Sequence, residues 1–163
     1  MEIGAIKFDR KGIIARFSTL INPGIPIPEA AARVNNISDT MLEGKPCLDD
    51  VMPDFLMFID TAILTAHNAP FDCGFINERL KKLCGEKADL PGGLIPPIIP
   101  NQIADTLLIS REVFPGRRSY SLQNLAADMG LPAASAHRAE DDAALCMGIL
   151  VRCIEALRAG PSG

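Results

Sequence analysis

Apolar and polar residues alternate near the start of the chain, a pattern typical of β-strands with one buried face. Two such stretches, residues 2–8 and 13–21, flank a turn over 9–12 and predict a β-hairpin. Short apolar runs at 62–66 and 103–104 predict two further strands. The chain is therefore expected to contain a hairpin and at least one buried strand.

Helical spacing of apolar residues is the main pattern in the rest of the chain. The expected helices cover residues 29–34, 38–42, 48–60, 71–84, 105–113, 121–129 and 138–158. Helices that alternate with short strands indicate an α/β layer fold with a mixed sheet. That sheet is short of strands for so many helices, and we expect its centre to be incomplete.

The length and composition fit one globular domain. The chain has 163 residues, of which 48% are hydrophobic and 22% are charged, enough to bury a core. No apolar run approaches the roughly 20 residues that a membrane helix requires, and the start of the chain lacks the basic region of a secretory signal. We therefore expect a cytoplasmic protein.

The net charge of −4 limits how the protein can bind nucleic acid. Binding through non-specific phosphate contacts usually requires a basic surface, so any nucleic-acid site here is expected to be local. An acidic balance is compatible with carboxylates that bind a divalent metal, because the metal supplies positive charge. The five cysteines lack CxxC spacing and predict free thiols rather than disulfides or a zinc site.

Asp142 begins the apolar face of the last expected helix. Helical steps from this residue reach Cys146, Ile149, Leu150, Cys153 and Leu157. A favourable interaction with the helix dipole explains the neighbouring acids Glu140 and Asp141, which project onto other faces. An inward carboxylate such as Asp142, by contrast, must be paired or must bind a cation.

Asp72 begins a second helical face in the same way. Helical steps from this residue reach Phe75, Ile76, Arg79, Leu80 and Leu83. Alone, Asp72 fits equally well as an N-terminal capping residue. Two helices that each begin an inward face with Asp nevertheless suggest converging carboxylates, and carboxylate oxygens are the ligands that Mg²⁺ or Mn²⁺ prefers.

Two histidines, His67 and His137, each stand five residues before one of these aspartates. A lone histidine is commonly a surface or core residue. From the loop before the last helix, however, the imidazole of His137 is able to lean over a metal held by Asp142. Packing residue and general base both remain open for His137 on this pattern alone.

Several segments resemble the DEDDh group of 3′→5′ exonucleases, which includes the proofreading epsilon subunit of bacterial DNA polymerase III. Residues 67–75 (HNAPFDCGF) resemble the second exonuclease motif of the group, and residues 137–142 (HRAEDD) resemble its third. Segments at 2–5, 105–107 and 120–125 correspond as well. The resemblance covers nearly the whole chain.

The resemblance implies a ribonuclease-H-like three-layer fold over residues 1–158, with a tail at 159–163. It also implies the removal of nucleoside monophosphates from the 3′ end of DNA or RNA, in a two-metal mechanism that uses Mg²⁺ or Mn²⁺. A DNA polymerase catalytic subunit is an expected partner of such a domain.

The resemblance further implies roles for individual residues. Asp72 and Asp142 are expected to hold the metals, and His137 is expected to take the proton from the attacking water. Asn68 and Phe71 are expected to shape the nucleotide pocket, Phe71 by packing against the terminal base or sugar.

The chain departs from the family in two places. Next to Val34, which is expected to act as a wedge against the penultimate base, relatives have His-Gly-Ile where this chain has Asn35-Asn36-Ile37. The first motif of the family, an Asp-x-Glu-Thr stretch on the central strand, does not occur in this sequence. Because that motif supplies two of the four acidic ligands, we expect this polypeptide alone to be catalytically poor and marginally stable.

Three explanations for the missing motif stay open. The start codon is misassigned and the complete protein is an exonuclease, or the chain is a degenerate nucleic-acid-binding or scaffold domain, or another chain supplies the strand. The presence of Asp72, His137 and Asp142 favours an active ancestor, since a pure binding domain has no need of this set. An unrelated hydrolase is disfavoured, because no GxSxG or P-loop pattern is present.

Overall fold

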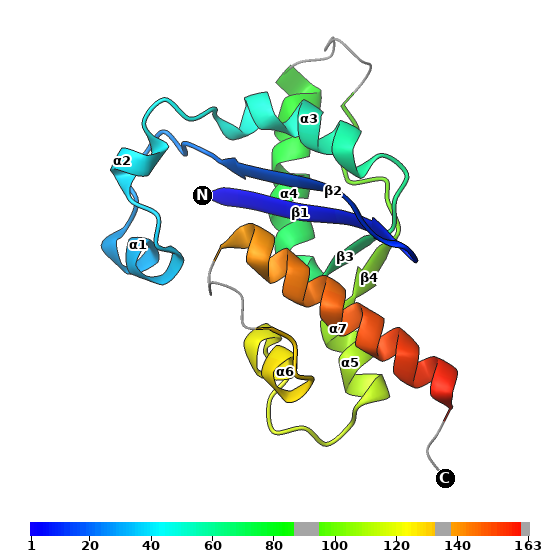
Figure 1. Cartoon of the computed structure of the whole chain (residues 1–163). Coiled ribbons are helices and arrows are strands. Elements are labelled where there is room, and N and C mark those ends of the chain that lie inside the picture. The colour runs from blue at the N-terminus through cyan, green and yellow to red at the C-terminus, as the bar shows by residue number, and fades with distance from the viewer. Residues whose placement is uncertain (87–94, 133–137, 161–163) are drawn as a thin grey trace.

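The computed structural model describes residues 1–86, 95–132 and 138–160, and its elements follow the order expected from the sequence (Figure 1). In chain order they are β1 (Glu2–Asp9), β2 (Gly12–Leu20), α1 (Glu29–Asn35), α2 (Asp39–Leu42), α3 (Leu48–Ile59), β3 (Leu64–Ala66), α4 (Ala69–Glu86), β4 (Ile103–Asp105), α5 (Thr106–Val113), α6 (Leu122–Asp128) and α7 (Ala139–Ala159). The expected tail lies mostly outside the described residues. None of the helices in these ranges is both long and apolar enough to cross a membrane.

Two separate two-stranded sheets take the place of the single mixed sheet expected from the sequence. β1 and β2 pair antiparallel, with Ile3 opposite Thr19, and β3 and β4 pair in parallel, with Thr65 opposite Ala104. Both strand orientations of a mixed sheet are present, and the α/β class is confirmed. Among the described residues, no ladder of hydrogen bonds joins β1 to β3, and this is where the sheet is divided.

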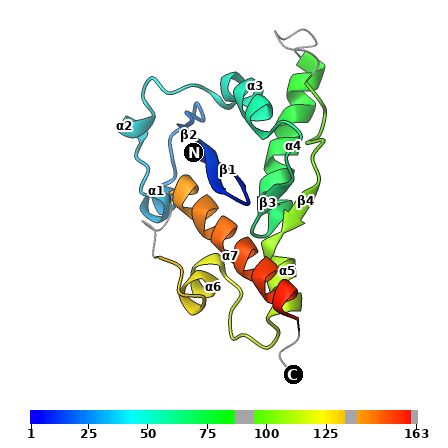
Figure 2. The same cartoon turned by 45° about the vertical axis from the view of Figure 1, so that its right-hand side comes forward.

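This division leaves an open edge on β1 and another on β3. Met1 and Ile21 exchange backbone hydrogen bonds of 3.1 and 2.8 Å, so the backbone groups of Met1 point toward the second strand of the hairpin. Successive residues of a strand direct their backbone groups to opposite edges. The backbone groups of Gly4 and Ile6 therefore point away from β2, and those of Thr65 point away from β4. In both Figure 1 and Figure 2, β1 is the hairpin strand nearer to β3. The incomplete centre expected from the sequence thus corresponds to the interval between β1 and β3.

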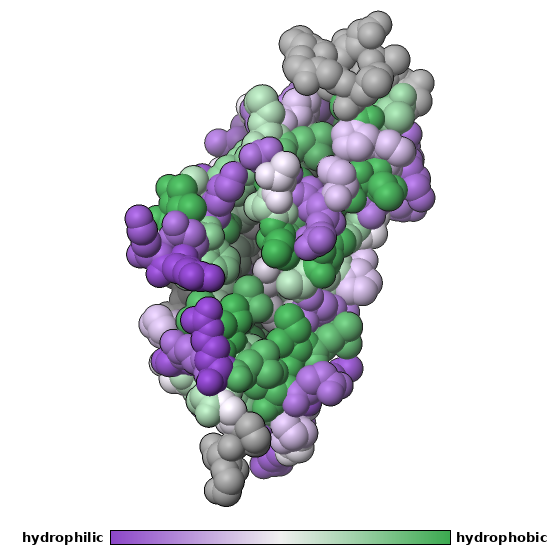
Figure 3. All heavy atoms as spheres, turned by 90° about the vertical axis from the view of Figure 1, so that its right-hand side faces the viewer, coloured by the Kyte–Doolittle hydropathy of each residue, from purple (hydrophilic) through white to green (hydrophobic). Residues whose placement is uncertain are grey.

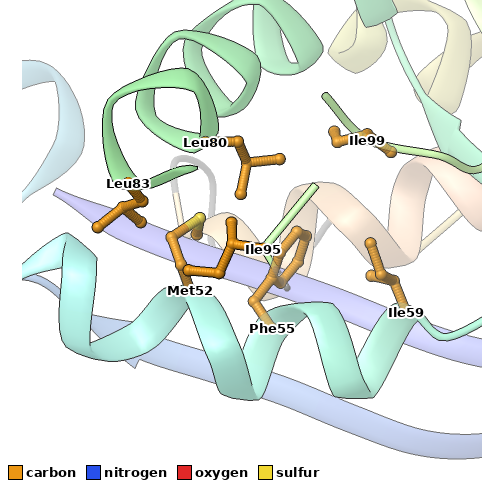
Figure 4. Close-up of a cluster of buried hydrophobic side chains, with 7 residues drawn as sticks. All are labelled: Met52, Phe55, Ile59, Leu80, Leu83, Ile95 and Ile99. Atoms are coloured by element: carbon orange, nitrogen blue, oxygen red, sulfur yellow. The ribbon is translucent and has the colours of Figure 1, made fainter. Parts of the chain in front are cut away.

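A hydrophobic core lies on one side of the hairpin, between α3 and α4 (Figure 4). Its buried members are Met52, Phe55, Ile59, Leu80, Leu83, Ile95 and Ile99. Ile3 and Ala5 of β1 pack against this cluster, and the Phe17 ring of β2 meets the Phe55 ring edge to face, with 5.7 Å between centroids. Apolar burial therefore fixes one face of the hairpin on α3.

The opposite face of β1 packs against α7, which adds a third layer. A Cβ on Gly4 would lie 2.3 Å from the backbone carbonyl carbon of Ala139, so only glycine permits this close approach. Glu2, whose side chain is 5% exposed, accepts hydrogen bonds from the Arg138 guanidinium at 2.8 and 3.1 Å and from the Ala139 N–H at 3.2 Å. These contacts hold the first turn of α7 against β1.

Exposed apolar side chains gather on the side of the molecule that carries β4, α5 and the end of α7 (Figure 3). Ile103 and Leu108 are among them, and Leu157, near the end of α7, is 64% exposed. The inward stripe that begins at Asp142 is confirmed through Cys146, Ile149 and Cys153, all of which are buried. It ends before Leu157 because α7 extends beyond the elements that cover its first turns.

Candidate active site

Asp72 lies near the start of α4, directly after β3. The residue is exposed, and so is Phe75, so the inward face expected to begin at Asp72 is wrong for its first turn and is buried only at Leu80 and Leu83. The protein around Asp72 nevertheless desolvates the carboxyl and raises its pKa above the ordinary value. A hydrogen bond from its own backbone N–H opposes this rise in pKa, and the negative charge of Asp105 adds to it. Among the residues that the structure describes, none forms an ion pair with Asp72. Its carboxylate is therefore open to a cation.

Asp105 holds the backbone that leads to Asp72. Its Oδ1 accepts a hydrogen bond from the Asn68 N–H and its Oδ2 accepts one from the Ala69 N–H, both at 3.1 Å. Ala69 is the first residue of α4, so Asp105 caps the start of this helix. Asp72 lies in the first turn of α4 and accepts a hydrogen bond from its own backbone N–H, so a capping contribution and metal binding both stay open for its carboxylate.

Asp142 lies in the first turn of α7 and is half-buried. The Gln123 side chain of α6 donates a hydrogen bond to its Oδ1 at 2.9 Å. Glu2 fixes the start of α7 through its hydrogen bonds with Arg138 and Ala139. Burial alone would raise the pKa of the Glu2 carboxyl, but these hydrogen bonds outweigh burial and hold that pKa below its usual range. Glu2 is therefore a structural residue and is not free to act as a metal ligand.

A polar network centred on Thr106 of α5 joins the segment that precedes α4 to α7. Thr106, which is fully buried, contacts the His67 Nδ1 at 2.9 Å, the Ala66 carbonyl at 3.2 Å and the Cys146 Sγ at 3.5 Å. Burial raises the pKa of the Cys146 thiol to about 11, with smaller contributions from the negative charges of Asp72 and Asp105. Cys146 lies one helical turn after Asp142, so the charges of Asp72 and Asp105 act on α7 close to that residue.

Both ring nitrogens of His67 are engaged. Nδ1 contacts the Thr106 hydroxyl, and Nε2 lies 2.8 Å from the Tyr120 carbonyl oxygen, to which it donates. Hydrogen bonds of His67 therefore connect the end of β3 to α5 and to the segment before α6. A histidine bonded at both nitrogens has no free nitrogen with which to take a proton from water.

The remaining residues expected at the site differ in how they are placed. Asn68 is exposed, and the side chain of Phe71 is 77% exposed at the start of α4. An exposed aromatic ring beside a carboxylate is suited to contact with a nucleotide base. His137 lies outside the described residues, and of Val34 the structure describes only its backbone in α1.

The described residues match a divalent metal in the type of ligand they offer. Asp72 and Asp142 provide carboxylate oxygens, and the nearby charge of Asp105 makes the surroundings negative, as a hard cation requires. No group of three or more His, Cys, Asp or Glu side chains gathers closely enough to hold a metal among these residues. The donor chemistry fits Mg²⁺ or Mn²⁺, and a complete coordination shell needs further ligands.

Asp105 is the site residue for which the sequence pattern predicted no role. Its signal was a carboxylate between a brief strand and a helix, which is a common position for an N-cap. Its bonds to Asn68 and Ala69 span 37 and 36 residues, and helical or strand periodicity does not report contacts of that range.

Replacing Asp72 with asparagine is expected to stabilise the fold at neutral pH. The folded protein disfavours the ionised carboxyl, because the folded-state pKa is raised above the unfolded value of 3.8. This cost is present above the folded-state pKa and disappears as the pH falls below the unfolded value. D72N should therefore raise the free energy of unfolding by about 0.5 kcal/mol at pH 7, a size limited by solvent screening, and not at pH 3. Urea titrations at both pH values measure the difference, and a loss of stability at pH 7 would contradict this expectation.

Comparison with known proteins places the chain in a family. Residues 1–150 match the family described as Exonuclease (RNase_T). The DNA polymerase III subunit epsilon of Treponema pallidum (strain Nichols) is 45% identical over 156 residues, which cover 94% of this chain and 67% of that protein. The DNA polymerase III subunit epsilon of Aquifex aeolicus (strain VF5) is 33% identical over 157 residues, which cover 96% of this chain and 72% of that protein.

A solved structure supports the fold. Exonuclease X in complex with 5′ overhanging duplex DNA matches 94% of this chain and 81% of that chain, with a TM-score of 0.72 and 24% sequence identity. This match confirms the ribonuclease-H-like fold that the motifs implied. Together with the family match and the second and third exonuclease motifs, it shows that the chain belongs to the exonuclease family, in the DEDDh group.

Proposed function

We propose that the chain is a metal-dependent 3′→5′ exonuclease domain of the proofreading type, which releases nucleoside monophosphates from the 3′ end of DNA. The observation that carries this proposal is that Asp72 and Asp142 lie in the first turns of α4 and α7, while Thr106 joins His67, just before α4, to Cys146 of α7. The names of the relatives, DNA polymerase III subunit epsilon, support DNA over RNA as the substrate.

Each candidate residue has a role in this proposal. Asp72 and Asp142 hold Mg²⁺ or Mn²⁺, which activates water and steadies the leaving 3′ oxygen when it is bound. His137 takes the proton from the attacking water. Phe71 stacks on the terminal base, and Asn68 borders the same nucleotide from the preceding turn. Val34 lies on a separate helix, α1, and acts as a wedge against the penultimate base.

Two further acidic ligands are needed, and we place them on a strand between β1 and β3. The open backbone edges of Gly4 and Ile6 on one side and of Thr65 on the other support this placement, since each is able to pair with an added strand. A strand there would also lie beside α7, which contacts both β1 and β3. Without it, the polypeptide is expected to hydrolyse DNA slowly.

A DNA polymerase catalytic subunit is the partner that fits this activity. The relatives with the epsilon name are subunits of DNA polymerase III, and the chain covers 67% and 72% of the two described above. A proofreading domain acts on the 3′ end that a polymerase has just extended, so association places the two sites near one another. The cytoplasmic location expected from the sequence belongs to the same proposal.

A second function is favoured by one observation. No cluster of three or more metal-ligating side chains exists among the described residues, as expected of a degenerate domain that binds nucleic acid or acts as a scaffold without cleaving it. In that case DNA binding would persist without metal and without product. The two functions differ in whether a mononucleotide is released.

The direction of digestion tests the proposal. Single-stranded DNA labelled at its 5′ end, incubated with the protein and Mn²⁺, is expected to give a ladder of labelled products that shortens gradually from the 3′ end. A 3′-terminal phosphorothioate linkage should slow the first step, and EDTA should stop digestion. Immediate release of the labelled 5′ nucleotide, or cleavage that begins inside the strand, would contradict the proposal.

A further inference from the structure

A single carboxylate, that of Asp105, satisfies the starts of two helices. Besides the N–H groups of Asn68 and Ala69, its Oδ1 accepts the N–H of Leu107 at 2.9 Å, in the first turn of α5. The first N–H groups of a helix have no partner within the helix, so each needs an acceptor from elsewhere. Asp105 therefore fixes the start of α4 relative to the start of α5.

The backbone that Asp105 holds is strained. Asn68 has a φ of 67°, in the left-handed region that residues other than glycine rarely adopt. The Asn68 carbonyl accepts the Phe71 N–H at 3.0 Å, so this turn leads directly into Phe71 and Asp72. A strained turn persists only where its surroundings hold it, and the hydrogen bonds from Asn68 and Ala69 to Asp105 do so.

The surroundings of Asp105 make it a support rather than a ligand. Both of its oxygens are engaged by backbone N–H groups. The adjacent residue Thr106 continues the link, because its hydroxyl reaches the Cys146 thiol of α7. The segment that leads to Asp72 is thus joined to α7 through the adjacent residues Asp105 and Thr106.

We infer that Asp105 is a positioning residue, which sets the place of Asn68, Phe71 and Asp72 relative to α7. Its effect on catalysis rests on the proposed function, whereas its effect on the backbone at Asn68 and Ala69 does not. The two effects are therefore measured separately.

Amide hydrogen exchange, read by NMR, measures the backbone effect in the full chain. In D105A, the amides of Asn68 and Ala69 are expected to exchange ~100-fold faster than in the unaltered protein, while amides of the core helix α3 keep their protection. If both amides stay protected in D105A, Asp105 does not hold this turn and the inference is wrong.

D105N keeps the test valid if the alanine variant fails to fold. Asparagine retains Oδ1, which accepts the N–H groups of Asn68 and Leu107, and replaces Oδ2, which accepts that of Ala69. The Asn68 amide should therefore stay protected while the Ala69 amide exchanges faster. Unchanged protection of both amides in D105N would overturn the inference, because the bond from Ala69 to Oδ2 would then not hold the turn.

Steady-state kinetics on 3′-labelled single-stranded DNA with Mn²⁺ measures the catalytic effect. D105A is expected to lower kcat about 100-fold with a smaller change in KM, as a misplaced catalytic group does, and D105N should restore most of the rate.

D39A is the matched control, since Asp39 likewise accepts a backbone N–H, that of Ile27 at 2.9 Å, in the α2 region. Normal kcat in D105A despite fast amide exchange would overturn the catalytic part of the inference. If the unaltered protein releases no nucleotide, the proposed function fails, and amide exchange still decides the structural part.

Discussion

Replacing Gly4 with alanine is expected to lower the free energy of unfolding by about 3 kcal/mol, at the upper end of the usual cost of overpacking. The added Cβ would lie 2.3 Å from the carbonyl carbon of Ala139 and 2.3 Å from the nitrogen of Glu140. Both are backbone atoms, so no side chain is able to move aside, and α7 must shift from β1. Such a shift also pulls on the contacts of Glu2 with Arg138 and Ala139.

A glycine in open surroundings provides the control. Gly74 lies in α4, and a Cβ added there meets no atom within 4 Å. G74A should therefore stabilise the protein by up to about 1 kcal/mol through helix propensity alone. Urea unfolding followed by circular dichroism measures both variants. Equal stability of G4A and G74A would contradict the close packing of β1 against α7.

Replacing Asp142 with alanine is expected to reduce nucleotide release by about 100-fold or more, which is the usual cost of removing one group that stabilises charge in a transition state. Asp142 is half-buried at the start of α7, and its carboxylate is one of the two proposed to hold the metal. D142A should lower the free energy of unfolding only modestly, since the Gln123 amide is near the surface and is able to bond to water instead.

Asp141 is the matched control for this variant. It occupies the same first turn of α7 and interacts with the same helix dipole, but it projects onto another face. D141A should therefore lose the dipole contribution and keep the activity. Rates of nucleotide release for the two variants, measured with equal amounts of folded protein, separate the two effects. Equal rates in D141A and D142A would contradict a catalytic role for Asp142.

Hydrophobic periodicity predicted most of the secondary structure. The hairpin expected at 2–8 and 13–21 is found at Glu2–Asp9 and Gly12–Leu20. The helix expected at 71–84 begins earlier, at Ala69, because the turn at Asn68 places Pro70 in the first turn, where proline is tolerated. Local patterns suffice for such elements because their residues are neighbours in the sequence.

Hydrophobic periodicity did not predict the long-range polar contacts. The ion pair of Glu2 with Arg138 spans 136 residues, and the hydrogen bond of Asn68 to Asp105 spans 37. A helical stripe shows that Asp142 faces inward but not which element it faces. The sequence therefore suggested the carboxylates of the proposed site, whereas the hydrogen bonds around them required the structure.

Release of mononucleotides by the unmodified chain tests the central claim most directly. Single-stranded DNA labelled at its 3′ end is incubated with the purified protein and Mn²⁺, and the products are separated by size. An exonuclease of this kind, short of two acidic ligands, is expected to release labelled mononucleotide slowly, and D142A should release it about 100-fold more slowly still. A folded protein that binds the DNA but yields no mononucleotide above the D142A background would contradict exonuclease activity in this chain and favour a binding domain.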